Sequence, residues 1–171
     1  LSGGEPLLRP DIVDVVRQMK EWNGTPYIIL VTNGYLLRPK LYRQLRAAGG
    51  DQISISLDFP DARHDEFRAI PGLFAHLQRL VPDLTAQGRQ DIVVNTAISR
   101  LNVTDLVTIC RMASNWGASM SFSAYSALRT GNRDLLVQSP ADLQLLRAQI
   151  DTLLDMKKQG WNIRNPVPDL E

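Results

Sequence analysis

The sequence has one cysteine, Cys110, among its 171 residues. One cysteine excludes an internal disulfide framework and is typical of a reducing compartment, so we expect a cytoplasmic protein. Long apolar segments are also lacking. None approaches the ~18 residues that a membrane-spanning helix needs, so no membrane association is expected. Basic runs are absent as well, and the formal net charge is only +1. Electrostatics therefore give no reason to expect nucleic acid as a partner.

An initiating methionine and a signal peptide are missing too. The sequence opens with Leu1 directly before a glycine turn, as though the body of a strand preceded it. We therefore interpret the sequence as a fragment. Its hydrophobic content of 44% is enough for one sizeable core. We expect a core domain at 1–160 and, at 161–171, an exit segment rich in proline and asparagine that leads toward a possible C-terminal extension.

Short apolar segments alternate with amphipathic ones along the chain. The apolar segments are rich in β-branched residues and predict strands at 26–31, 53–57, 92–98 and 119–124. Helical spacing predicts helices at 11–22 and 39–48, a helical stretch divided at Pro71-Gly72, a helix after Asn102, and a last helix at 139–160. Regular alternation of this kind predicts an α/β fold with a parallel sheet and right-handed crossovers.

Small polar residues lie along one face of three predicted strands. Ser54 and Ser56 alternate with isoleucines in the second strand, Asn95 lies in the third, and Ser121 and Ser123 lie in the fourth. A closed barrel core is normally filled by bulky branched side chains, and an open doubly wound sheet is apolar on both faces. The polar rows therefore favour an incomplete barrel whose lumen holds a polar ligand. Hydroxyls bonded to the backbone in a dry core are the alternative.

Compact polar groups also follow the ends of the predicted strands. They are Gly3-Gly4-Glu5, Thr32-Asn33, Ser56 to Asp58, Asn95 to Ser99, and Ser123 to Tyr125. In parallel α/β folds the carboxyl ends of the strands form the rim where ligands bind. In the first group two glycines leave the backbone bare and Glu5 adds a carboxylate, which suits a cationic group such as an ammonium. Five such strand ends favour one shared site.

The order and spacing of these motifs resemble the radical S-adenosylmethionine (SAM) superfamily, joined part-way through its partial (β/α)6 TIM-like barrel. Gly3-Gly4-Glu5-Pro6 resembles the motif after the second strand of that barrel, and Thr32-Asn33-Gly34 the turn after the third. The stretch from Ser54 to Asp58, followed by His64 and Arg68, is similar to the fourth-strand region of one branch. That branch includes molybdopterin-precursor cyclases and peptide- and haem-maturation enzymes. On this resemblance 1–160 would be the core barrel without its first strand and cluster loop.

The resemblance also implies which residues surround the cofactor. They are Gly3, Gly4, Glu5, Asn33, Ser56, Asp58, Asn95 and Tyr125. Glu5 would accept a hydrogen bond from the ammonium of SAM, Ser56 and Asn95 would hold hydroxyls or the carboxylate, and Tyr125 would flank the adenine. No residue of this chain is expected to be an acid–base catalyst or a metal ligand. The family's Cys-x3-Cys-x2-Cys loop is absent, and the lone Cys110 lies on an apolar helical face, where a buried thiol is expected.

The activity implied for the full-length protein is reductive cleavage of SAM at a [4Fe–4S] cluster whose cysteine ligands are expected upstream of Leu1. The resulting 5′-deoxyadenosyl radical would abstract hydrogen from an unidentified small-molecule or peptide substrate. An electron donor such as flavodoxin or ferredoxin is expected, and the fragment alone should be inactive. One alternative is a degenerate, non-catalytic SAM-binding or scaffold module. Another is a phosphate- or sugar-binding barrel, which is disfavoured because the lysines fall on predicted helices and loops.

Four further residues lead to local expectations. His64, with Asp65 and Glu66, is predicted to form a cap or surface pair rather than a metal site, because consecutive residues at a helix start diverge around the axis. Arg68 is expected either to pair with Asp65, three residues back on the helix, or to reach a carboxylate of the cofactor. Ala69 stands where similar proteins often have glycine after the arginine. Asn102 is predicted to cap the helix that follows it.

Overall fold

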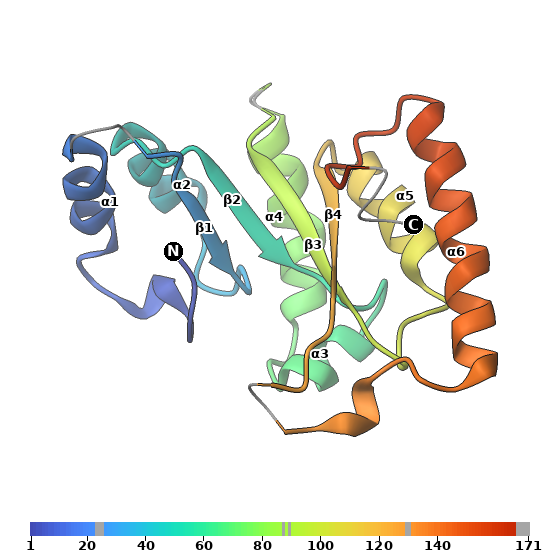
Figure 1. Ribbon diagram of the computed structural model, residues 1–171. Coiled ribbons are helices and arrows are strands. Elements are labelled where there is room, and N and C mark those ends of the chain that lie inside the picture. The colour runs from blue at the N-terminus through green and yellow to red at the C-terminus, as the bar shows by residue number, and fades with distance from the viewer. Residues whose placement is uncertain (23–25, 87, 89, 129–130, 167–171) are drawn as a thin grey trace.

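The computed structural model is a four-stranded parallel sheet in the order β1-β2-β3-β4 (Figure 1). It describes residues 1–22, 26–86, 88, 90–128 and 131–166. The strands are β1 (Ile29–Thr32), β2 (Gln52–Ser56), β3 (Ile92–Ile98) and β4 (Ser119–Ala124). The predicted α/β class and parallel strand order are thereby confirmed. In Figure 1, α2, α4 and α5 lie behind the sheet, whereas the front face is left open.

Helices alternate with the strands along the chain, as the alternating pattern predicted. They are α1 (Ile12–Glu21), α2 (Pro39–Ala47), α3 (Arg63–Arg68), α4 (Leu73–Thr85), α5 (Leu106–Asn115) and α6 (Pro140–Lys158), with 3₁₀ turns η1 (Pro6–Leu8) and η2 (Arg133–Leu135). The divided helical stretch is the pair α3 and α4. At the start of α6 the Ser139 hydroxyl caps the helix by accepting a hydrogen bond from the Asp142 N–H at 3.0 Å. In the described part of the chain, none of these helices is long and apolar enough to cross a membrane.

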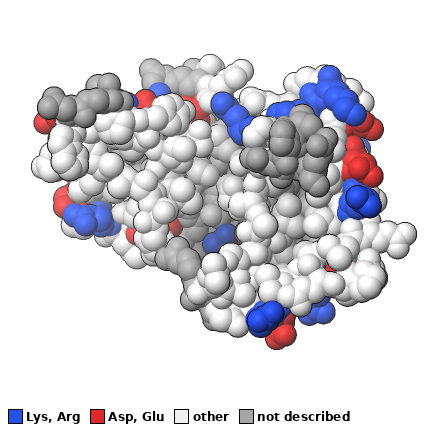
Figure 2. All heavy atoms as spheres, in the orientation of Figure 1, with Lys and Arg blue, Asp and Glu red and all other residues white. Residues whose placement is uncertain are grey.

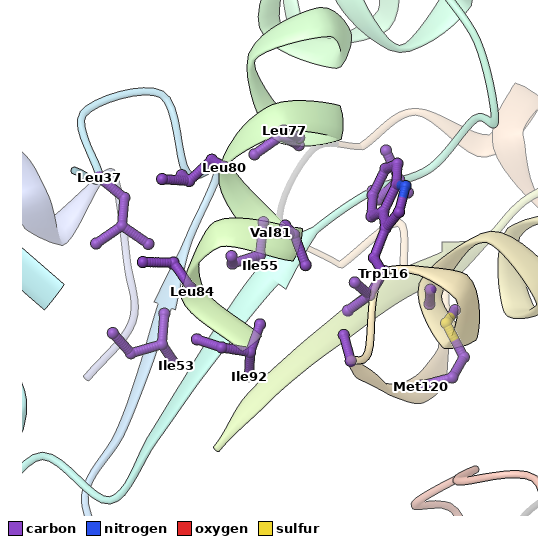
Figure 3. Packing of buried hydrophobic residues seen from close by; sticks show 14 of the residues in the cluster. Leu37, Ile53, Ile55, Leu77, Leu80, Val81, Leu84, Ile92, Trp116 and Met120 are labelled. Atoms are coloured by element: carbon purple, nitrogen blue, oxygen red, sulfur yellow. The ribbon is translucent and has the colours of Figure 1, made fainter. Parts of the chain in front are cut away.

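The hydrophobic core lies between the sheet and the helices behind it. Ile53 and Ile55 of β2 point toward Leu77 and Val81 of α4, and all four side chains are buried (Figure 3). Cys110 of α5 belongs to the same core, as predicted. Successive residues of a strand face opposite sides of a sheet, so the residues that alternate with these isoleucines face the open front. The core thus packs on the side opposite the polar rows of the strands, in which Ser56 and Ser121 are half-buried and Ser54 is buried.

Short main-chain segments lie along both edges of the sheet. At the β1 edge, the Val31 N–H donates to the Leu1 carbonyl at 2.9 Å. At the β4 edge, the backbone N–H and carbonyl of Met120 form hydrogen bonds with the residues just before and just after Ile163. The side-chain amide of Asn165 accepts a hydrogen bond from the Phe122 N–H and donates one to the Phe122 carbonyl. The described part of the predicted exit segment, 161–166, therefore runs beside β4. Residues 167–171 lie outside the described residues, and the boundary at 160 stays a prediction.

The connection after β2 departs from the sequence expectations. His64 is fully buried, and its Nδ1 accepts a hydrogen bond from the Asp58 N–H at 3.2 Å. The prediction of a surface or capping pair was wrong, because the first turn of α3 packs beneath the end of β2. Asp65 instead accepts hydrogen bonds from the Gly72 and Phe74 N–H groups, both at 2.6 Å, at the start of α4. Burial lowers the pKa of His64 to about 4.

Asn102 also lies where the sequence did not place it. Asp105, not Asn102, holds the N-cap position of α5. The Asn102 side chain is fully buried, and its amide donates to the carbonyls of Asp58 and Ala97, both at 3.0 Å. Its oxygen accepts from the Ser99 N–H at 2.8 Å. Because its side chain forms hydrogen bonds with backbone groups that follow both strands, Asn102 links the end of β2 to the end of β3.

Ala69 ends α3 in the left-handed backbone region, with φ of 53°. Among the described residues it is the only one other than glycine with a positive φ. The left-handed conformation brings Cβ close to a neighbouring carbonyl oxygen, a conflict that glycine avoids. Ala69 is therefore a strained residue.

We predict that Ala69→Gly stabilises the fold by about 0.5–1 kcal/mol, because relief of strain exceeds the added entropy of the unfolded chain. The matched control is Ala75→Gly at an exposed position in the first turn of α4, which should destabilise by up to about 1 kcal/mol. Urea unfolding of the three proteins measures both changes. An equal loss of stability in both variants would contradict the assignment of strain to Ala69.

We also predict that the fold loses stability in mild acid through His64. The pKa of His64 in the folded state, about 4, lies below its ordinary value of 6.5, so the unfolded chain takes up the proton first. Stability is therefore complete above pH 6.5 and falls toward pH 4. The slope approaches about 1.4 kcal/mol per pH unit.

The control for this prediction is His64→Gln, which cannot titrate. It leaves in place His76, whose pKa is also lowered by burial. Urea unfolding of both proteins at several pH values should show a shallower loss for the variant, although the variant starts from a lower stability. Identical slopes for the two proteins would show that His64 does not cause the acid sensitivity.

Candidate functional site

A polar hollow of about 250 Å³ opens at the carboxyl ends of β1 and β2. It is lined by Ser2, Gly3, Gly4, Glu5, Val31, Thr32, Asn33, Ser56 and Arg68. Figure 2 shows the same front face hollowed near its centre, with most of the visible charged side chains toward the periphery. Larger cavities of about 660 and 380 Å³ lie against α6, but their walls are mainly apolar. The hollow near Glu5 is therefore the better candidate for a polar ligand.

Gly3 and Gly4 form one wall of this hollow with bare backbone. Their φ angles are 105° and 55°, a region that side chains disfavour. A Cβ added at either position would meet no atom within 4 Å. Glycine is thus required here by the shape of the turn and not by close packing. The space that two side chains would fill stays open, so a ligand can approach the backbone closely.

Glu5 fastens this turn to the end of β1. Its Oε1 accepts hydrogen bonds from the Thr32 hydroxyl at 2.6 Å and from the Leu7 N–H at 3.2 Å, and its Oε2 accepts from the Asn33 N–H at 2.8 Å. Each carboxylate oxygen can accept about two hydrogen bonds, so Oε2 keeps capacity for a donor in the hollow. The carboxylate is therefore held in position before any ligand arrives.

The turn at Asn33 and Gly34 is set by packing. The Asn33 side-chain oxygen accepts a hydrogen bond from the Tyr35 N–H at 2.8 Å, which fixes the asparagine in a local turn. Gly34 has φ of 81°, and a Cβ there would lie 2.6 Å from a methyl group of Leu77. The close approach of α4 thus dictates glycine and places Asn33 at the rim of the hollow.

Ser56 is the first member of a polar row that crosses the sheet. It pairs in register with Asn95 of β3, which pairs in turn with Ser121 of β4. Residues in register on neighbouring strands project from the same face, about 4.8 Å apart. Because Ser56 lines the hollow, Asn95 and Ser121 extend the row away from it along the open face, although neither belongs to the lining.

Asp58 and Arg68 form an ion pair at the edge of the hollow. Asp58 is 1% exposed, and its Oδ2 accepts hydrogen bonds from Nε and Nη2 of Arg68 at 2.8 and 2.6 Å. Of the two partners considered for Arg68, Asp65 is excluded, because that carboxylate caps α4. Arg68 lines the hollow, whereas Asp58 lies behind it. The site residues predicted from the sequence omitted Arg68, and its spacing after Ser-Leu-Asp was the available signal.

Tyr125 lies apart from the hollow. It lines the 380 Å³ cavity against α6 and another of about 530 Å³, and its hydroxyl donates to the Asn132 carbonyl at 3.2 Å. Five of the eight predicted residues thus line one hollow, namely Gly3, Gly4, Glu5, Asn33 and Ser56. Asn95 and Asp58 adjoin it, and Tyr125 does not. Within the described residues, no group of three or more His, Cys, Asp and Glu side chains is placed to hold a metal ion.

Comparison with known proteins identifies the family. Residues 1–112 match the model of the radical SAM superfamily. The chain is 34% identical to an AdoMet-dependent heme synthase of Methanosarcina barkeri, over 84% of this chain and 41% of the relative. It is 32% identical to a probable GTP 3′,8-cyclase of Thermoplasma volcanium, over 77% of this chain and 40% of the relative. The chain therefore spans about two-fifths of the length of each.

A solved structure supports the fold. The crystal structure of Streptococcus suis SuiB bound to S-adenosylmethionine superposes with a TM-score of 0.70 and covers 94% of this chain and 37% of the SuiB chain. Sequence identity is 16%, so this likeness concerns the architecture alone. The open parallel sheet is thus similar to a part of a radical SAM barrel. Together with the family match over most of its length, this shows that the chain belongs to the radical SAM superfamily, whose cofactors are SAM and a [4Fe–4S] cluster.

Proposed function

We propose that the full-length protein is a radical SAM enzyme that abstracts hydrogen from a small-molecule or peptide substrate. The observation that carries this proposal is the hollow at the ends of β1 and β2, where bare glycine backbone, a fixed carboxylate and a serine hydroxyl face one space. The family match supports it, as do relatives named as a heme synthase and a cyclase. When bound, the two cofactors supply one-electron cleavage of a carbon–sulfur bond.

The residues of the hollow fit the amino-acid end of SAM. An ammonium needs several acceptors, which the carbonyls of Gly3 and Gly4 and the free capacity of the Glu5 carboxylate supply. Ser56 offers a hydroxyl that can donate to a carboxylate or exchange hydrogen bonds with a ribose hydroxyl. In this proposal Glu5 orients the cofactor and does not transfer a proton. The substrate would be bound farther along the open face, where Asn95 and Ser121 continue the polar row.

The proposal extends to partners and location. The reaction needs one electron from outside the protein, and we propose a small electron carrier of the flavodoxin or ferredoxin kind as its source. We propose a cytoplasmic location, where thiols stay reduced, because the chain's one cysteine is a buried free thiol. Burial also raises the pKa of Cys110 to about 11, so this cysteine is protonated at neutral pH.

The activity is tested on the full-length protein, purified without oxygen and supplied with iron and sulfide to rebuild the cluster. We expect 5′-deoxyadenosine to form from SAM once a reductant is added, and not without it. Chromatography of the quenched mixture measures the product. A protein that carries an intact cluster and yields no 5′-deoxyadenosine would instead be a non-catalytic SAM-binding or scaffold module.

We predict that Glu5→Gln weakens SAM binding about tenfold to a hundredfold, because a charge-assisted hydrogen bond to the ammonium is lost while the side chain keeps its shape. Calorimetric titration of the full-length protein without reductant measures the affinity. Glu66→Gln, which changes an exposed acid of α3 outside the hollow, is the matched control and should bind as the wild type does. Unchanged affinity in Glu5→Gln would refute the role of Glu5 at the ammonium.

A further inference from the structure

The helix α6 lies at the edge of the molecule beyond β4 and packs mainly against α5 (Figure 1). Of its 19 residues only Leu153 and Met156 are buried, whereas α4 buries five of its 13 residues. Leu143 and Leu145 of α6 are 50% and 46% exposed. Helices in proteins gain most of their stability by packing an apolar face. Among the described residues, α6 therefore has apolar surface that no other element covers.

Part of this uncovered surface forms a continuous stripe along the helix. Leu143, Ile150 and Leu154 are separated by seven and four residues, which places them on one side of an α-helix. Arg147 and Asp151 lie on the same side, and all five residues line the cavity of about 660 Å³. Every described residue of that lining belongs to α6, so the cavity lacks an opposite wall within the described chain. We call these five residues the α6 stripe.

Two opposite charges lie at the middle of the α6 stripe. Arg147 and Asp151 are both exposed, and they lie about 6 Å apart along the helix axis. Neither side chain forms an ion pair or a hydrogen bond with another residue that the structure describes. A surface that fits the stripe therefore carries an acid opposite Arg147 and a base opposite Asp151, with apolar side chains at both ends.

A second copy of the α6 stripe meets these requirements when the two helices run antiparallel. A two-fold axis through the middle of the stripe places Arg147 opposite Asp151 of the partner subunit. The same axis brings Leu143 close to Leu154 of the partner subunit, since the two leucines lie at nearly equal distances from the centre. In a parallel pair each charge would instead face a like charge. An isologous contact uses one surface twice, so every one of these pairs forms twice.

We propose that the full-length protein forms a homodimer in which the α6 stripes of two copies pack antiparallel across a two-fold axis. The charge pattern selects a second copy as the occupant, because the stripe is complementary to itself. The cavity of about 380 Å³ shares Leu143 and Ile150 with the stripe and extends the apolar surface toward the end of β4. Two helices of about 28 Å bury less area than a standard interface, so we expect a dimer that dissociates on dilution. The inference goes beyond the proposed function and does not depend on SAM.

The test is a charge exchange, read by sedimentation velocity of the full-length protein over a range of concentrations. The wild type should be a dimer that dissociates as the protein is diluted. Arg147→Asp sets two acids face to face twice in the dimer, so dimerisation should weaken by about tenfold to a hundredfold. Asp151→Arg should weaken it by a similar factor. The double variant, with both substitutions, exchanges the charges and should recover the affinity of the wild type.

Two further variants test the apolar contact and the specificity of the charge effect. Leu143→Glu changes a half-exposed side chain, so the fold should persist while dimerisation weakens. Lys40→Asp reverses an exposed charge on α2, away from the stripe, and should dimerise as the wild type does. Circular dichroism checks that every variant is folded.

Three results would overturn the inference. They are a wild type that stays monomeric at every concentration, a double variant that stays as weak as the single variants, and equal weakening by Lys40→Asp. Recovery in the double variant alone among the charge variants of the stripe supports the antiparallel pairing of two copies.

Discussion

The packing of helices against one face of a parallel sheet is the constraint on which the rest of this structure depends. Side chains alternate between the two faces of each strand, so the isoleucines of β2 pack against α4 while Ser54 and Ser56 face the other way. A dry core on both faces would have required apolar residues at the serine positions. On the front face Ser54 is buried, whereas Ser56 is half-buried and lines the hollow, so the site can form there without disturbing the core.

The carboxyl ends of the strands are joined by polar contacts between segments distant in sequence. Glu5 links the first turn to the end of β1, and Asn102 links the ends of β2 and β3. A buried polar group is costly unless it is hydrogen-bonded, and here the side chains of Glu5 and Asn102 are satisfied. Their bonds go mainly to backbone N–H and carbonyl groups. The rim of the sheet is therefore rigid where the hollow lies, which lowers the entropic cost of binding a ligand there.

The hollow combines opposite charges with uncharged backbone. Glu5 stands at the glycine wall and Arg68 at the end of α3, and each is held by neighbouring groups before a ligand arrives. Fixed charges of this kind lose little on binding, because they need not reorganise. In the proposed function, the cofactors of the family supply the chemistry, and this chain would supply a preorganised polar surface that orients SAM. The family match and the geometry of the hollow both support the proposed role of this edge of the sheet.

The sequence by itself determined the elements of this protein and the edge of the sheet that carries the site. Apolar periodicity located four strands and their helices, and the polar groups after the strands marked the rim, because both signals are local. That Gly3, Gly4, Glu5, Asn33 and Ser56 lie together at this edge follows from their places after the strands, whereas their contact with a cofactor stays a prediction. Pairings across long stretches of sequence were not. Only the tertiary structure decided that Arg68 pairs with Asp58 rather than Asp65, that His64 and Asn102 are buried, and that Tyr125 lies apart. Each of these depends on how the loops after β2, β3 and β4 pack on one another, and side-chain spacing along one chain carries no record of that packing.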